Sequence, residues 1–192
     1  MARTKTISDA DLLEVARGVF VETGFSGSSK EIARRAGVSE GVLFQRFKTK
    51  EELFFAAMTP PPVDLSALFE HPSAQGLELL EQITFAMADY FRATLPVLIP
   101  LMSHPSFQFE EFARRHPDSA LVTLRRQLMT FMMEQQREGK IGFVDPGAAS
   151  LAIWAMAHTV AFFEQLGAHD GKMPEAIMRA TVQCLWTGMK PG

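Results

Sequence analysis

The sequence predicts an all-α fold of nine or ten helices, and two observations support this prediction. Nearly every long segment repeats its apolar residues with the 3.6-residue period of a helix, and no segment alternates convincingly as a strand would. The expected helices also begin at capping residues and end at glycine or proline. The chain has 192 residues, of which 47% are hydrophobic, so it can bury a sizeable core.

Four short helices are expected at the N-terminal end, each behind a residue whose side-chain oxygen can cap it. We expect their starts at Ser8 or Asp9, Ser28 or Ser29, Ser39 and Thr49, with Gly24 and Gly37 ending the first two.

The later helices are expected between prolines and glycines. A long amphipathic helix should run from about residue 76 to Phe91 or Thr94. Pro96 and Pro100 should cut the next stretch into short pieces, because proline interrupts a helix. Further helices are expected over residues 106–115, 117–138, 145–167 and 174–188.

Charge is distributed unevenly along the chain. Residues 1–50 carry nine basic and six acidic side chains, whereas the remainder carries 10 basic and 16 acidic ones. A cationic segment on an acidic body suits local contact with a polyanion. The single Cys184, the absence of a signal-peptide pattern and the lack of an apolar run of about 20 residues favour a soluble, cytoplasmic protein.

The segment from Ser28 to Phe47 has the pattern of a helix-turn-helix. Gly37 supplies the positive φ that the tight turn requires. Leu43 and Phe47, four residues apart, should anchor the second short helix onto the first. The other side chains of that helix should face outward, and these are Ser39, Glu40, Gly41, Val42, Phe44, Gln45 and Arg46.

On these residues the chain resembles the TetR/AcrR family of bacterial regulators. The resemblance covers residues 9–57 and includes IARRAGVS, the GVLF step and the exit Phe47-Lys48-x-Lys50-Glu51. It implies a helix-turn-helix DNA-binding domain over residues 1–50 and a ligand-binding and dimerisation domain over residues 51–192. The implied function is a transcriptional regulator, expected to be a repressor released from a palindromic operator by a small apolar ligand. The resemblance implies neither a cofactor nor an enzymatic activity.

The resemblance also implies the DNA contacts. The second short helix would enter the major groove, where Gln45 could bond an adenine edge. Two positions depart from the family, which commonly has Tyr at the position of Phe44 and His at that of Arg46. Phe44 has no hydroxyl, so it cannot donate the hydrogen bond to phosphate that a Tyr could make. Arg46 could replace that contact with a permanent charge. The candidate contacts are Ser28, Ser29, Lys30, Ser39, Glu40, Gly41, Val42, Phe44, Gln45, Arg46, Lys48 and Lys50.

A ligand pocket would lie among the middle helices, as the resemblance implies. Single Met and Phe residues there are more often plain core than pocket lining, and Tyr90 and His158 fit either role. The irregular backbone expected at Pro96 and Pro100 is a candidate place for ligand-linked movement. The candidate lining residues are Met87, Tyr90, Phe91, Leu98, Met102, Phe107, Leu124, Leu128, Phe131, Trp154 and His158.

The last two helices are expected to form a homodimer interface, because both are apolar over more than one face. Two helices from each protomer would form a four-helix bundle, as is usual in the family. Such a dimer should recognise half-sites about 34–36 Å apart, or a multiple of that. The candidate interface residues are Ala149, Ala152, Ile153, Met156, Val160, Phe163, Ile177, Thr181, Cys184 and Leu185.

Other functions are weaker. The common nucleophile, phosphate-binding and zinc-protease motifs are absent from the sequence. A metal site from His104, Glu110 and His116 is conceivable but disfavoured, and no metal is expected. A ligand-binding or partner-binding protein without DNA affinity is the second alternative. Arg3 and Lys5 could form an arm that reaches the minor groove, although a frayed basic tail is the favoured interpretation.

Overall fold

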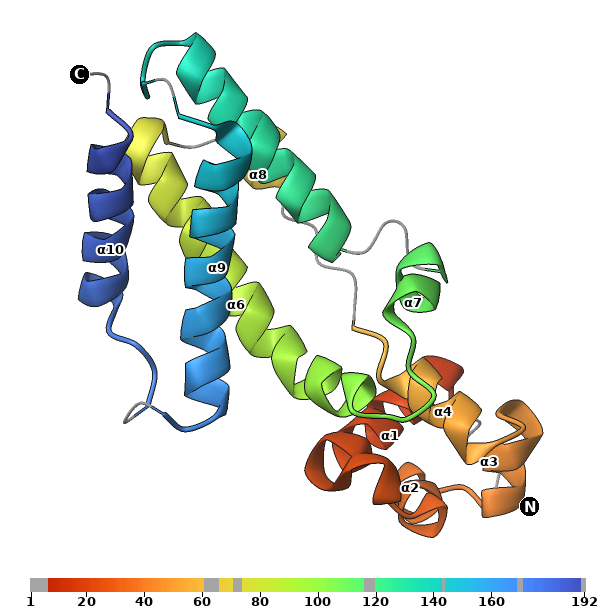
Figure 1. Cartoon of the computed structure of the whole chain (residues 1–192). Helices are drawn as coiled ribbons and strands as arrows, with labels where there is room; N and C mark the ends of the chain where they lie inside the picture. Colours follow the sequence, from red (N-terminus) through yellow and green to blue (C-terminus); the bar gives the residue numbers. More distant parts are fainter. Residues whose placement is uncertain are drawn as a thin grey trace. The chain divides into compact units, whose positions relative to one another are not determined.

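The computed structural model describes residues 7–60, 66–70, 74–115, 120–142, 144–168 and 171–190. These residues form ten α-helices, one 3₁₀ helix and no strand, which confirms the all-α prediction (Figure 1). Arg3, Lys5, His116 and the helix start expected at residue 117 lie outside the described residues.

The elements are named in chain order. Their bounds are α1 Asp9–Thr23, η1 Gly24–Ser26, α2 Ser29–Ala36, α3 Glu40–Arg46, α4 Lys50–Ala57, α5 Ser66–Glu70, α6 Gly76–Met102, α7 Phe109–Arg115, α8 Ala120–Arg137, α9 Pro146–Gln165 and α10 Glu175–Gly188.

The chain divides into two compact units. Unit 1 comprises Met1–Pro61 and Pro96–Phe112, and unit 2 comprises Pro62–Leu95 and Ala113–Gly192. Helix α4, which a division at residue 50 assigns to the second domain, packs against α1 in unit 1. The functional division at residue 50 itself stays a prediction.

Three of the four expected side-chain caps form in unit 1. Ser8, Ser39 and Thr49 each accept a backbone N–H from the first turn of their helices, α1, α3 and α4. Gly24 and Gly37 end α1 and α2 with φ of 64° and 69°, a region that glycine enters without steric cost. Local chemistry therefore sets the limits of the first four helices.

Helix α6 corrects one prediction, because it runs unbroken through Pro96 and Pro100 to Met102. The two prolines are four residues apart and lie on the same, only half-buried side of the helix, where carbonyls left without a partner can turn toward water. Leu98 and Leu101 are buried and hold the other side of this final part of the helix. The expectation of short, proline-separated pieces was therefore wrong.

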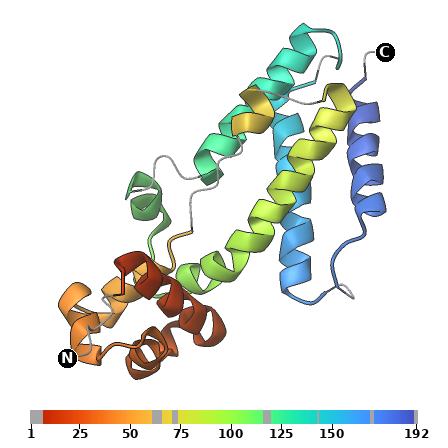
Figure 2. The ribbon, with the colours of Figure 1, turned by 180° about the vertical axis from the view of Figure 1, so that it is seen from behind.

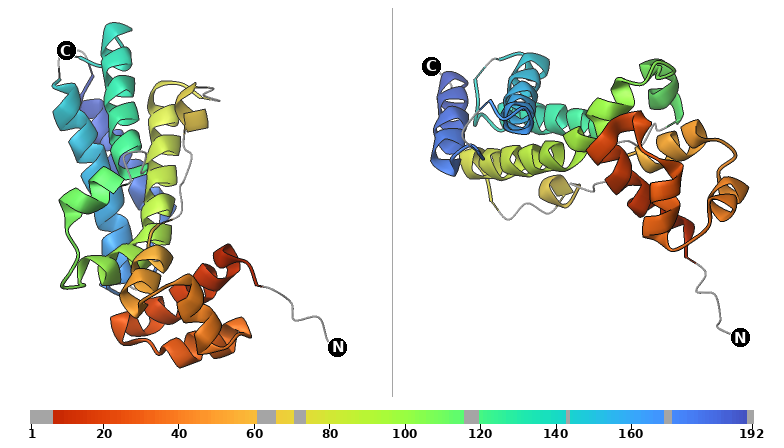
Figure 3. Two further views of the ribbon diagram at one scale, coloured as in Figure 1. Left: turned by 90° about the vertical axis from the view of Figure 1, so that its right-hand side faces the viewer. Right: turned by 90° about the horizontal axis from the view of Figure 1, so that it is seen from below.

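Unit 2 consists mainly of α6 up to Leu95 together with α8, α9 and α10 (Figures 2 and 3). Helices α8 and α9 pack along each other. The ring of Phe91 in α6 meets Trp154 and His158 of α9 at centroid distances of 5.0 and 5.1 Å. Arg179 of α10 pairs with Glu81 of α6. Helix α6 is therefore in contact with both C-terminal helices.

Helices α6 and α9 are also long and apolar enough to cross a membrane by length and composition alone. Half of the tested window is buried in α6, but only 22% of it in α9. Core helices of soluble proteins pass the same test, so the soluble state stays a prediction. The exposed apolar surface of α9 still needs an explanation, and a second protein surface would supply one.

Candidate nucleic-acid interface

Helix α3 is fastened to unit 1 by two apolar side chains. Leu43 is fully buried, and Phe47 at the end of the helix is 9% exposed. They lie in a core with Leu12 and Phe20 of α1 and with Ile32 of α2, all of which are buried. The spacing of four residues puts both anchors on one side of α3 and leaves the rest of the helix facing away from the core.

The turn before α3 has the expected geometry. The Val38 N–H donates to the carbonyl of Ala33 at 3.0 Å, which closes the turn around the left-handed Gly37. The Ser39 Oγ accepts the N–H of Val42 at 3.3 Å and starts α3. This geometry fixes where the outward side of α3 lies relative to α2.

The outward side of α3 is open. Glu40, Gly41 and Gln45 are exposed, whereas Val42 and Phe44 are half-buried. Among the described residues, the side chains of Glu40 and Gln45 have no hydrogen-bond or ion-pair partner. A hydrogen-bonding side chain beside apolar ones is a combination that base edges in a major groove can match.

Groups that could bind an anion precede and follow this helix in the chain. Ser28 caps α2 without a side-chain hydrogen bond of its own, and Lys30 in the first turn of α2 is exposed. Ser29 is half-buried beside them, and Lys48 follows α3 and is exposed. The N–H groups at the start of a helix and nearby cationic side chains both favour phosphate oxygens.

Two of the predicted phosphate contacts have partners within the chain. Arg46 donates through Nη1 to the Ile7 carbonyl at 2.8 Å and to the Asp9 carboxylate at 2.9 Å. The Lys50 ammonium lies 4.8 Å from the centroid of the Phe25 ring. Both side chains therefore have partners within unit 1.

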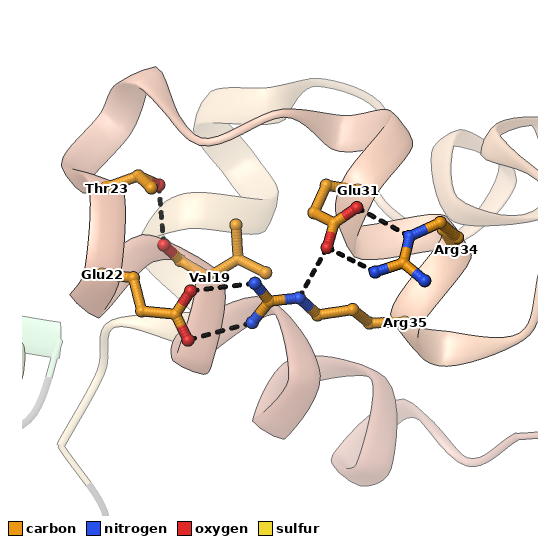
Figure 4. Close-up of polar contacts among 6 residues, drawn as sticks. All are labelled: Val19, Glu22, Thr23, Glu31, Arg34 and Arg35. Atoms are coloured by element: carbon orange, nitrogen blue, oxygen red, sulfur yellow. Dashed lines mark hydrogen bonds and ion pairs between the residues drawn. The ribbon is translucent and has the colours of Figure 1, made fainter.

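A network of four charges joins α1 to α2 (Figure 4). Arg35 binds Glu22 through two hydrogen bonds of 2.9 Å and also donates to Glu31 at 2.8 Å. Arg34 binds both oxygens of Glu31 at 2.7 and 2.8 Å. These hydrogen bonds, first from Arg34 and then from Arg35, lower the pKa of Glu31 from 4.5 to about 2.

Sequence reasoning missed this network. The pairs within α2 have the helical spacings of three and four residues and could have been found. The pair between Arg35 and Glu22 joins two helices across 13 residues, and no local pattern predicts it. Arg17 was missed for the same reason, because its Nε donates to the Ala57 carbonyl at 2.8 Å, 40 residues along the chain.

His104 lies in an aromatic box in unit 1. Its ring is 4.4 Å from Phe25, 5.3 Å from Phe54 and 5.2 Å from Phe55. Its Nδ1 accepts the N–H of Ser106 at 3.2 Å, which gives that nitrogen a backbone partner. Within the part of the chain that the structure describes, no group of three or more His, Cys, Asp or Glu side chains could hold a metal ion.

The structure divides the ligand candidates between the two units. In unit 2, Met87, Tyr90, Phe91, Leu124, Leu128 and Phe131 are buried, and Trp154 and His158 are half-buried. In unit 1, Leu98 is buried, Phe107 is half-buried against Phe112, and Met102 is 58% exposed. Burial raises the pKa of the Tyr90 hydroxyl and lowers the pKa of the His158 imidazole.

The interface candidates lie on α9 and α10, and most of them reach the surface. Ile153 is the exception, because it is fully buried within its own chain. The exposed members are Ala152, Phe163, Ile177, Thr181 and Cys184, and the half-buried ones are Ala149, Met156, Val160 and Leu185. The sequence interpretation missed Leu151 and Leu166 of this region, which are 65% and 59% exposed.

Comparison with known families gives one match at the helix-turn-helix. Residues 12–57 match the family model of bacterial regulatory proteins of the tetR family. This range contains α2, α3 and α4 and most of α1.

Solved structures of regulators share the fold along nearly the whole chain. A TetR family transcriptional regulator from Pseudomonas syringae is 21% identical, with a TM-score of 0.60, over 95% of this chain and 97% of that one. PfmR from Thermus thermophilus is 22% identical, with a TM-score of 0.62, over 97% and 100%. FadR from Bacillus subtilis, solved with stearoyl-CoA, is 17% identical, with a TM-score of 0.65, over 95% and 100%.

At these sequence identities the solved structures show a shared fold. The family match identifies the helix-turn-helix as that of the tetR family. Residues 12–57 therefore carry the helix-turn-helix of the tetR family of bacterial regulatory proteins, and the chain as a whole shares its all-helical fold with solved regulators.

Proposed function

We propose that the chain is a transcriptional repressor that binds a palindromic operator as a homodimer and is released by a small apolar ligand. The observation that carries the proposal is the open outward side of α3, where Gln45 is exposed while Leu43 is fully buried. Lys30 and Lys48 flank this side with exposed cationic groups. Together they offer base recognition between phosphate contacts.

Two copies of α3 are needed to recognise a palindrome, and α9 with α10 offers the surface for pairing. Leu151 and Leu166 of α9 and Ile177 of α10 are each more than half exposed. Small residues such as Ala152 and Ala155 lie on the exposed side of α9 and permit close helix approach. A four-helix bundle from two protomers would bury this surface.

The ligand proposal is supported by the apolar interior of unit 2. Met87, Phe91 and Leu128 are buried there, and the half-buried Trp154 and His158 lie against Phe91. The FadR protein of similar fold was solved with stearoyl-CoA, so a long acyl chain is the first ligand class to test. A ligand that prefers the DNA-free state would weaken operator binding by about 5–150-fold.

Selection from a random-sequence duplex library with the full-length chain tests the DNA-binding part. The expected product is a pseudo-palindrome whose half-sites are about 34–36 Å apart, or a multiple of that. Gln45→Ala should relax the preference at one base pair of each half-site. The matched control Gln75→Ala, which changes an exposed glutamine of unit 2, should leave it unchanged. Failure to bind any duplex at low salt would refute the proposal and favour a ligand-binding protein without DNA affinity.

Stearoyl-CoA, with coenzyme A as the control, tests the ligand part. Release of the selected duplex by the acylated compound alone is the expected result. Hydrolysis of the compound during the assay would instead indicate an enzyme, since a sensor releases its ligand unchanged.

A further inference from the structure

Most cationic side chains of the DNA-binding unit have internal partners. Residues 7–60 contain seven Lys and Arg side chains. Three of them, Arg34, Arg35 and Arg46, pair with carboxylates, whereas Lys30 and Lys48 have no partner among the described residues. Arg17 and Lys50 contact a backbone carbonyl and an aromatic ring instead. Three of the seven positive charges are therefore neutralised by carboxylates within the chain.

The pair on the recognition helix has the most direct consequence. Arg46 lies at the end of α3, and its guanidinium contacts both the Asp9 carboxylate and the Ile7 carbonyl. The Arg46 side chain is only 22% exposed, whereas that of Asp9 is 69% exposed. The Asp9 carboxylate thus binds the Arg46 guanidinium, which a phosphate oxygen could otherwise bind.

The second set repeats this arrangement between α1 and α2. Glu31 accepts hydrogen bonds from Arg34 and Arg35, and Glu22 binds Arg35 with both oxygens (Figure 4). The two arginines and two glutamates sum to zero charge. The pKa of Glu31, lowered to about 2, keeps this carboxylate ionised at any pH at which DNA binding would be studied.

A carboxylate binds guanidinium in the same forked geometry as a phosphate does. An arginine that keeps its carboxylate releases no counterion from DNA and adds nothing to sequence-independent affinity. We propose that Asp9, Glu22 and Glu31 act as internal phosphate mimics, which hold Arg46, Arg34 and Arg35 off the DNA backbone and so lower the affinity for non-operator sequences. This inference rests on the proposed DNA-binding function.

Salt dependence measures the number of phosphates neutralised, so it tests the inference directly. The assay is the affinity of the full-length dimer for a random-sequence duplex as salt concentration rises. Asp9→Asn removes the carboxylate that pairs with Arg46 in each protomer and leaves its positive charge available to a phosphate. The log–log salt slope should therefore steepen by about 1.8 per dimer at ~0.9 per phosphate. Glu31→Gln frees Arg34 and leaves Arg35 with Glu22, so a similar change is expected.

Glu14→Gln is the matched control. Glu14 is an exposed acid of α1 without a described partner, so its removal changes net charge without freeing an arginine. This variant should raise affinity slightly and leave the slope unchanged.

Three outcomes separate the possibilities. Steeper slopes for Asp9→Asn and Glu31→Gln, with the wild-type slope for Glu14→Gln, support the inference. Wild-type slopes for Asp9→Asn and Glu31→Gln, or the same change of slope in all three variants, overturn the inference and leave the proposed function intact. Absence of wild-type binding at low salt overturns the proposed function itself.

Discussion

Replacing Arg92 with methionine should destabilise unit 2 more than the same replacement at the exposed Arg125 of α8. Arg92 of α6 donates to both oxygens of Glu164 of α9 at 2.7 and 2.9 Å and to Asp89 at 2.8 Å. Glu164 also accepts the N–H of Met173, in the segment that leads to α10. The ion pair therefore joins α6, α9 and the segment that leads to α10.

The magnitude follows from burial. The side chains of Arg92 and Glu164 are 18% and 11% exposed, so solvent screens the pair only in part. Removing one partner of a fully buried pair costs about 3–5 kcal/mol. Because the pair retains some solvent contact, we expect Arg92→Met to lower the free energy of unfolding by about 2–4 kcal/mol. That corresponds to roughly 4–16 °C in Tm for a chain of this size.

Urea unfolding at fixed protein concentration measures this loss, since dimerisation would make stability concentration-dependent. The hydrogen bonds from Arg92 are the main cause of the lowered pKa of Glu164. A depressed carboxyl pKa adds stability above the unfolded value of 4.5, and this stability is lost as the pH falls below it. The difference between wild type and Arg92→Met should therefore shrink in acid.

Arg125→Met, at an exposed arginine of α8, is the matched control and should change stability by less than about 0.5 kcal/mol. A double-mutant cycle with Glu164→Gln should give a coupling of about 1–3 kcal/mol. A coupling near zero, or equal effects of the two arginine substitutions, would refute the assigned role of the pair.

Three further predictions concern the anchor, the charge network and the dimer. Leu43→Ala should lower the free energy of unfolding by about 2–5 kcal/mol, because the side chain is fully buried. Val21→Ala, at an exposed site, should not, and equal losses in chemical unfolding would contradict the core assignment. Acidification from pH 5 to 2 should destabilise the wild type more than Glu31→Gln. The folded-state pKa of Glu31 is lowered from 4.5 to about 2, so the stability that its carboxylate contributes is lost in that interval. Parallel stability–pH profiles of the two proteins would exclude this contribution. Ile177→Glu should shift a dimer toward monomer in sedimentation velocity, whereas Gln75→Glu should not; an unchanged dimer would place the interface elsewhere.

The sequence predicted what depends on neighbouring residues. Caps at Ser8, Ser39 and Thr49 and the left-handed Gly37 are local features, and each formed as expected. Leu43 was identified as an anchor from helical spacing and is fully buried.

Prediction failed where distant parts of the chain decide the outcome. Pro96 suggested a helix end from its local chemistry, yet α6 continues because its other side is held by burial. Arg46 stays a predicted DNA contact, but its partners within the chain, Ile7 and Asp9, lie 39 and 37 residues away and were not predicted. Spacing within one helix contains no information about such partners.

Site-specific photocross-linking tests the central claim that the outward side of α3 lies against a duplex. A photoreactive side chain is placed at position 45 in α3 or, as a control, at position 75, and the protein is irradiated with the selected operator. A cross-link to a major-groove base edge is expected from position 45 and none from position 75. Cross-links that arise equally from both positions, or from position 75 alone, would contradict it.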